Sequence, residues 1–106
     1  MWTIVKIDKK KINLFKNEMI NKLGKDCKFY APKIKVAAIR NNKKIEKIFF
    51  LLGDYVFCNH KKFNQRDTII QLKSIIGIKY FIKNFFLAQN EIGFFIDKCK
   101  QMECQD

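Results

Sequence analysis

Hydrophobic positions along the first quarter of the chain change their period once. Residues 2–7 are rich in β-branched side chains and alternate towards their end, which predicts a strand. From Lys11 onward, apolar residues recur at helical spacing, and Gly24 follows as a C-terminal stop. The pattern therefore predicts a strand followed by an amphipathic helix. The apolar stripe of this helix is Ile12, Phe15, Met19, Ile20 and Leu23.

Extended structure is predicted for the middle of the chain. Residues 29–32 favour a second strand, and Pro32 indicates an edge or a bend rather than a central position. Residues 34–36 and 45–48 flank Asn41-Asn42, a pair that tolerates the left-handed conformation of a tight turn. This segment is expected to be a basic β-hairpin.

The remaining elements alternate between strands and helices. Residues 55–58 form a short apolar run without alternation, which predicts a buried central strand. Asp67 is expected to cap a short helix, before another strand at residues 78–82. A second amphipathic helix is predicted over residues 91–100. The hairpin connections predict an α+β fold, an antiparallel four-stranded sheet flanked by helices, in a single domain of residues 1–106.

Composition adds a strong positive charge to this picture. The 106 residues are 48% hydrophobic and carry a net charge of +12. Such a charge predicts attraction to polyanions, namely nucleic acid, an anionic membrane or an acidic protein surface. A genome rich in A and T would also raise the lysine content, and only Arg40 and Arg66 are arginines. The charge alone therefore identifies no partner.

Cysteine spacing and hydropathy argue against several classes. Cys27, Cys58, Cys99 and Cys104 form no C-x-x-C pair, so we expect reduced thiols, no metal and no cofactor. The cysteines and His60 could in principle ligate zinc, but their spacing matches no closed zinc module. No apolar stretch reaches the length of about 18 residues needed to span a bilayer. We therefore expect a cytoplasmic protein. We also expect that it is not an enzyme, because no nucleophile or phosphate-loop motif is present.

Several motifs in order carry a resemblance to a known family. They are the Trp2 strand, Phe29-Tyr30-Ala31-Pro32, the basic hairpin, Phe49-Phe50 leading through Gly53 to Tyr55-Val56-Phe57, and Ile75-Ile76-Gly77-Ile78 followed by Phe81. This order resembles the N-terminal domain of the NusG family of transcription elongation factors, which includes RfaH-like antiterminators. The similarity runs from Trp2 to the last helix, without the C-terminal KOW domain. It implies a monomeric, polymerase-binding factor that is associated with the nucleoid through RNA polymerase.

The resemblance implies a docking surface for the clamp helices of the largest polymerase subunit. Between the two phenylalanines and the tyrosine, this chain has Leu51-Leu52-Gly53-Asp54, two residues longer than the family's usual Pro-Gly. In a plainer interpretation, the aromatic residues here are edge and core residues beside an ordinary turn. The residues implied to bind the clamp are Phe49, Phe50, Leu52, Tyr55, Ile78 and Phe81.

Two further contacts are implied by the same resemblance. Lys9, Lys10, Lys11 and Lys22 match the region that faces upstream or non-template DNA, and lysines there would contact phosphates rather than read bases. They would equally suit a solvated helix face. Arg66 and Thr68 match the region that faces the gate loop of the second large subunit.

The expected function is to bridge the polymerase cleft and suppress pausing or termination. One alternative is a basic module that binds single-stranded nucleic acid by stacking bases on Tyr30, Tyr80 and Phe81. Another is a small inhibitor that competes with the general elongation factor for polymerase. The sequence does not separate these three interpretations.

Overall fold

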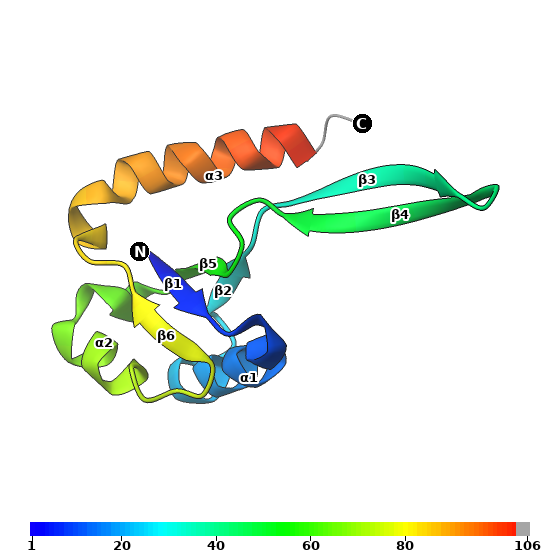
Figure 1. Ribbon diagram of the computed structural model, residues 1–106. Coiled ribbons are helices and arrows are strands. Elements are labelled where there is room, and N and C mark those ends of the chain that lie inside the picture. Colours follow the sequence, from blue (N-terminus) through cyan, green and yellow to red (C-terminus); the bar gives the residue numbers. More distant parts are fainter. Residues whose placement is uncertain (104–106) are drawn as a thin grey trace.

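The computed structural model describes residues 1–103, and in this part of the chain six strands and three α-helices are present (Figure 1). Their order confirms the predicted α+β class. The strands are β1 (Trp2–Ile7), β2 (Lys28–Tyr30), β3 (Lys33–Arg40), β4 (Lys43–Phe50), β5 (Tyr55–Asn59) and β6 (Ile78–Phe81). The α-helices are α1 (Ile12–Leu23), α2 (Arg66–Leu72) and α3 (Gln89–Glu103), joined by the short 3-10 helices η1 (Lys9–Lys11), η2 (Lys61–Asn64) and η3 (Phe85–Ala88).

Four of the strands form one antiparallel sheet in the order β2-β5-β1-β6. The apolar run of β5 occupies a central position, and β2, which precedes Pro32, lies at an edge, as predicted. Directly paired residues of antiparallel strands project to the same face. Val5 pairs with Val56 and Phe81, whereas Lys6 pairs with Tyr55 and Tyr80, so these two sets lie on opposite faces.

Helices cover both faces of the sheet, which gives three layers (Figure 1). On the face of Val5, Phe15 from α1 is completely buried and lies 5.7 Å from the ring of Phe29. Full burial of such a side chain stabilises the fold by about 1.5 to 3 kcal/mol. On the other face, Phe95 of α3 lies 6.0 Å from the ring of Phe57. We call these two faces the α1 face and the α3 face.

The start of α3 is tied to the first strand by a glutamine. The Gln89 Oε1 atom accepts a hydrogen bond from the Trp2 backbone N–H at 2.8 Å, and its Nε2 donates to the Trp2 carbonyl at 2.7 Å. This double contact holds the helix over the end of β1 that carries Trp2. At the opposite end of β1, Lys6 pairs with Tyr55 and Tyr80, and Tyr80 is 45% exposed, so this part of the α3 face is not fully covered.

Strands β3 and β4 form the predicted hairpin, which projects away from the layers as an arm (Figure 1). Asn41 and Asn42 form its turn with φ values of 54° and 62°, in the left-handed region that Asn tolerates. At the base of the arm, Glu103 of α3 accepts hydrogen bonds of 2.9 Å from the Tyr30 hydroxyl and the Lys33 backbone N–H. The C-terminal end of α3 therefore contacts the segment that enters the arm.

The predicted capping role of Asp67 is wrong. Gln65 is the N-cap residue of α2, and Asp67 lies inside the first turn. A carboxylate there still interacts favourably with the helix dipole. The predicted helix over residues 91–100 is correct in place, but it extends over Gln89–Glu103. The side chains of both terminal residues make hydrogen bonds to other elements.

Candidate functional site

An apolar groove of about 400 Å³ lies between α3 and the exposed part of the α3 face. Side chains from β1, the turn before β5, β5 itself and α3 converge there. Grooves of this size with few polar groups are typical binding sites for another molecule. The groove is lined by Ile4, Leu52, Tyr55, Phe57, Glu91, Ile92 and Phe95.

Two of the predicted docking residues, Leu52 and Tyr55, line this groove from the turn before β5 and from the start of β5. Residues 51–54 form the turn, in which Gly53 adopts a φ of 61° and the Tyr55 N–H donates to the Leu52 carbonyl at 3.3 Å. Leu52 is half-buried against the core, whereas Leu51 is exposed. The turn thus places Leu52 and Tyr55 in the groove lining.

A tyrosine pair and a lysine form the polar end of the α3 face. The hydroxyl groups of Tyr55 and Tyr80 are 2.8 Å apart, and Lys6 Nζ lies 5.7 Å from the centroid of each ring. The hydrogen bond between the two hydroxyl groups, followed by burial, raises the pKa of Tyr55. Tyr80 was not among the predicted clamp-binding residues. The register of β1 with β6 would have identified it, because Tyr80 shares a face with Tyr55.

Two of the predicted clamp-binding residues lie on the face opposite the groove. Ile78 pairs with Ile7, and Phe81 pairs with Val5, so both project towards α1 rather than into the groove. Phe81 is only 8% exposed. A register shift between Lys6 and Ile7 changes the alternation of β6, and motif matching did not detect this shift. A docking contact by Phe81 is excluded by its burial, and Ile78 does not belong to the groove.

Phe49 and Phe50 lie at the base of the hairpin, where both are exposed. They are neighbours in β4 and therefore project from opposite faces of the arm. Phe50 pairs with Lys33, and Lys9 Nζ lies 3.5 Å from the centroid of its ring. The structure thus places both phenylalanines on the arm, outside the groove lining.

The predicted DNA-facing lysines do not form one cluster. Lys9, Lys10 and Lys11 are the three residues of η1. Burial lowers the pKa of Lys9, and the nearby Asp54 carboxylate partly offsets this effect. Lys22 lies in the last turn of α1, roughly 16 Å along the helix axis from Lys11. Only the three η1 lysines share one site.

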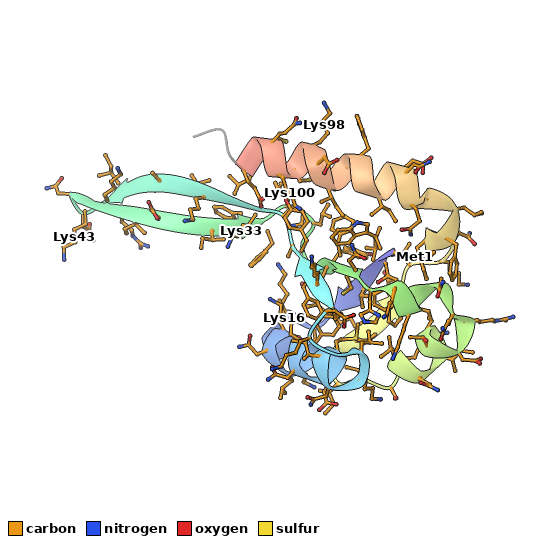
Figure 2. The ribbon with its side chains drawn as sticks, turned by 180° about the vertical axis from the view of Figure 1, so that it is seen from behind. Met1, Lys16, Lys33, Lys43, Lys98 and Lys100 are labelled. Carbon is orange, nitrogen blue, oxygen red and sulfur yellow. The ribbon has the colours of Figure 1, made fainter. Side chains whose placement is uncertain are left out.

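A second basic site, absent from the predicted set, lies at the tip of the hairpin. Arg40 and Lys43 are directly paired beside the turn, and Figure 2 shows Lys43 at the end of the arm furthest from the helices. Residues 33–50 contain six basic side chains and one acidic side chain. The basic residues of the predicted hairpin are the sequence signal that indicates this site.

The two predicted gate-loop residues differ in accessibility. Arg66 is exposed at the first position of α2, where it lines a hollow of about 250 Å³ together with Lys73, Ile70 and Phe86. Thr68 is only 8% exposed, and its hydroxyl donates to Gln65 Oε1 at 3.4 Å. Thr68 therefore cannot bridge to a partner, because it is turned into the core side of the helix.

The cysteines within the described residues are free and buried. Burial, followed by the nearby Asp26 carboxylate, raises the pKa of Cys27 to about 11, and burial also raises the pKa of Cys58 and Cys99. Such thiols are protonated at neutral pH and are poor nucleophiles and metal ligands. Cys104 lies outside the described residues.

Histidine 60 is engaged in a structural contact. Its Nδ1 atom accepts the Lys62 backbone N–H at 3.0 Å, and its Nε2 lies 2.9 Å from Asp26 Oδ1. Within residues 1–103, no cluster of three or more His, Cys, Asp or Glu side chains is placed to hold a metal ion. In the same range, no helix combines the length and the apolar character required to cross a membrane.

Comparison of the sequence with protein-family models finds no match, and comparison with curated proteins finds none. The function is therefore inferred from the groove, the arm and the order of motifs that resembles the NusG family.

Proposed function

We propose that this chain is a transcription elongation or antitermination factor that docks the sheet-α3 groove on the clamp helices of RNA polymerase. The main observation that supports this proposal is the apolar groove of about 400 Å³, which includes Leu52 and Tyr55 in its lining. These two residues stand where the resemblance to the NusG family implies clamp contact. Helices commonly bind to apolar grooves through aromatic and aliphatic anchors.

In this proposal, the rest of the molecule bridges the polymerase cleft. The η1 lysines and the basic tip of the arm supply phosphate contacts to upstream or non-template DNA. Arg66 is the remaining candidate for a gate-loop contact, because it is exposed at the start of α2. The protein acts at the nucleoid by binding and breaks no bond. A coupling of about 1 to 3 kcal/mol between docking and clamp closure would change pause occupancy about 5- to 150-fold.

The direct test is capture of core RNA polymerase from the source cell by the purified chain. We expect wild type to bind and Phe50→Ala/Tyr55→Ala to lose binding. The first change removes an exposed ring at the base of the arm, and the second removes part of the groove lining. Ile39→Ala is the matched control, because Ile39 is also apolar and 82% exposed, but lies near the arm's tip. Circular dichroism must show that all variants fold. Failure of the wild-type protein to bind polymerase would contradict the proposal.

A second candidate function is favoured by the Lys6, Tyr55 and Tyr80 cluster. Base stacking on exposed tyrosines beside a cation is a common way to hold single-stranded nucleic acid. Of the aromatics predicted for this role, Tyr80 is 45% exposed, whereas Phe81 is buried and Tyr30 is half-buried. Salt separates the two functions, because phosphate binding weakens steeply with salt and apolar docking does not.

A competitor of the general elongation factor would use the same groove. A pausing assay separates an activator from such an inhibitor: the former shortens pauses by itself, whereas the latter only abolishes the effect of the general factor.

A further inference from the structure

One flank of α3 carries an exposed stripe next to the groove. Its members recur at i, i+3, i+4, i+7 and i+11, so they follow one line along the helix. Phe94 is 66% exposed and Phe95 is 42% exposed, whereas Ile92 and Ile96 of the same helix are buried against the sheet. We call this set the α3 stripe: Glu91, Phe94, Phe95, Lys98 and Met102.

The α3 stripe and the groove form one continuous surface. Glu91 and Phe95 line the groove, and the same two residues line a second hollow of about 500 Å³ with Phe94, Lys98 and Asn90. A row of side chains spaced three and four residues apart, with two phenylalanines within it, matches the ridge pattern by which two helices pack. The combined surface is therefore suited to a partner helix lying along α3.

Two residues of opposite charge, Glu91 and Lys98, flank Phe94 and Phe95 along α3. Glu91 is the only charged residue in the groove lining, in a chain of net charge +12. Within residues 1–103, Glu91 makes no salt bridge or hydrogen bond through its side chain. Lys98 lies seven residues later, about 10.5 Å along the axis. Its Nζ lies 5.3 Å from the centroid of the Phe94 ring, and Figure 2 shows Lys98 on the outer side of α3.

We propose that Glu91 and Lys98 select the partner helix by charge. The occupant is a helix that presents a basic side chain to Glu91 and, about two turns away, an acidic side chain to Lys98, with its apolar positions on Phe94 and Phe95. This inference rests on the proposed function, in which the occupant is one of the clamp helices. Opposed charges at an interface set register and reject wrong partners, because like charges brought together cost several kcal/mol.

Charge reversal of single residues tests the inference. Binding to immobilised core RNA polymerase is measured for wild type, Glu91→Lys, Lys98→Glu and Asp97→Lys. Asp97→Lys is the matched control for Glu91→Lys, since both exchange an acidic for a basic side chain, and Asp97 is exposed on another side of the same helix. We expect Glu91→Lys and Lys98→Glu each to weaken binding about tenfold, with smaller effects at high salt, and Asp97→Lys to leave it unchanged.

The outcomes separate this inference from the proposed function. Tight wild-type binding that Glu91→Lys and Lys98→Glu leave unchanged overturns charge selection and leaves docking intact. Equal losses in Glu91→Lys and Asp97→Lys also overturn it, because the effect then follows net charge rather than position. Wild type that fails to bind polymerase overturns both. Urea unfolding of each variant excludes loss of fold, and Glu91→Gln provides a milder second variant, expected to weaken binding less than Glu91→Lys.

Discussion

The hydroxyl groups of Tyr55 and Tyr80 meet at 2.8 Å across strand β1, above the lysine that pairs with both of them. Tyr55 comes from β5 and Tyr80 from β6, so the hydrogen bond joins two strands that are not neighbours. Lys6 lies between the two rings. The contact therefore fixes the orientation of Tyr55 at the edge of the groove.

Removing one hydroxyl tests this relationship. Because the Tyr80 hydrogen bond is the largest cause of the raised pKa of Tyr55, Tyr80→Phe should lower that pKa towards its ordinary value. NMR titration of the Tyr55 ring carbons measures the change, and Lys79→Ala, on the same strand, is the control. A Tyr55 pKa that stays raised in Tyr80→Phe would show that burial, not the hydroxyl pair, causes the shift.

Two glycines should respond to alanine with opposite signs. Gly77 has a φ of 94°, and a Cβ there would lie 3.3 Å from the Cβ atoms of Lys11 and Phe15. Gly77→Ala should destabilise the fold by about 1 to 2 kcal/mol or more, from the left-handed backbone alone. Gly93 is helical with open space around its position, so Gly93→Ala should stabilise by up to about 1 kcal/mol. Urea unfolding of the pair measures both, and equal signs would contradict the argument.

Much of the fold was predictable because its signals are local. The period of α1 and the Asn41-Asn42 turn each depend on residues close together in the sequence, and both predictions are confirmed. The docking set was less predictable, because it depends on which face each strand residue occupies. The pairing of Phe81 with Val5 and of Tyr80 with Lys6 places Phe81 in the core and Tyr80 on the surface, and the register shift after Lys6 turns Ile78 to the α1 face. No local pattern in β6 shows this.

The contribution of α3 to the candidate site shows the same limit. Its amphipathic pattern predicts a stripe of Ile92, Phe95, Ile96 and Cys99. Ile92, Ile96 and Cys99 are buried, whereas Phe95 is 42% exposed. The pattern does not show that Phe95 borders a groove, because the groove depends on where the helix crosses the sheet. The double hydrogen bond between Gln89 and Trp2 sets that crossing, across 87 positions of sequence.

Glutamate 103 should set the direction of the arm. Glu103→Ala removes the acceptor of both the Tyr30 hydroxyl and the Lys33 amide, at a cost to stability of about 1 kcal/mol. Hydrogen exchange at the Lys33 amide should accelerate, and residual dipolar couplings of β3 and β4 should decrease relative to those of β1. Glu103→Gln keeps an acceptor oxygen and is the control. Unchanged couplings in Glu103→Ala would mean that the arm is held by other contacts.

Acid should weaken the contact between Asp26 and His60. The hydrogen bond from His60 is the main cause that lowers the pKa of Asp26 below its ordinary 3.8. A carboxylate with a lowered folded-state pKa contributes stability above 3.8, and this contribution is lost as the pH falls through the folded value. Asp26→Asn should therefore reduce stability at neutral pH and flatten the loss of stability in acid. Thermal melts from pH 7 to about pH 2 measure this, with exposed Asp97→Asn as the control.

Paired charges at the tip of the arm should dominate the salt dependence of DNA binding. Arg40 and Lys43 are exposed, directly paired and far from the groove, so their removal should not disturb the core. If both contact phosphates of duplex DNA, Arg40→Ala/Lys43→Ala should reduce the slope of log K against log salt by about 1.8. The matched control is Lys61→Ala/Lys62→Ala, which removes the same charge from exposed positions of η2. Equal slopes for the two double variants would show that DNA responds only to net charge, and that the arm is not a specific contact.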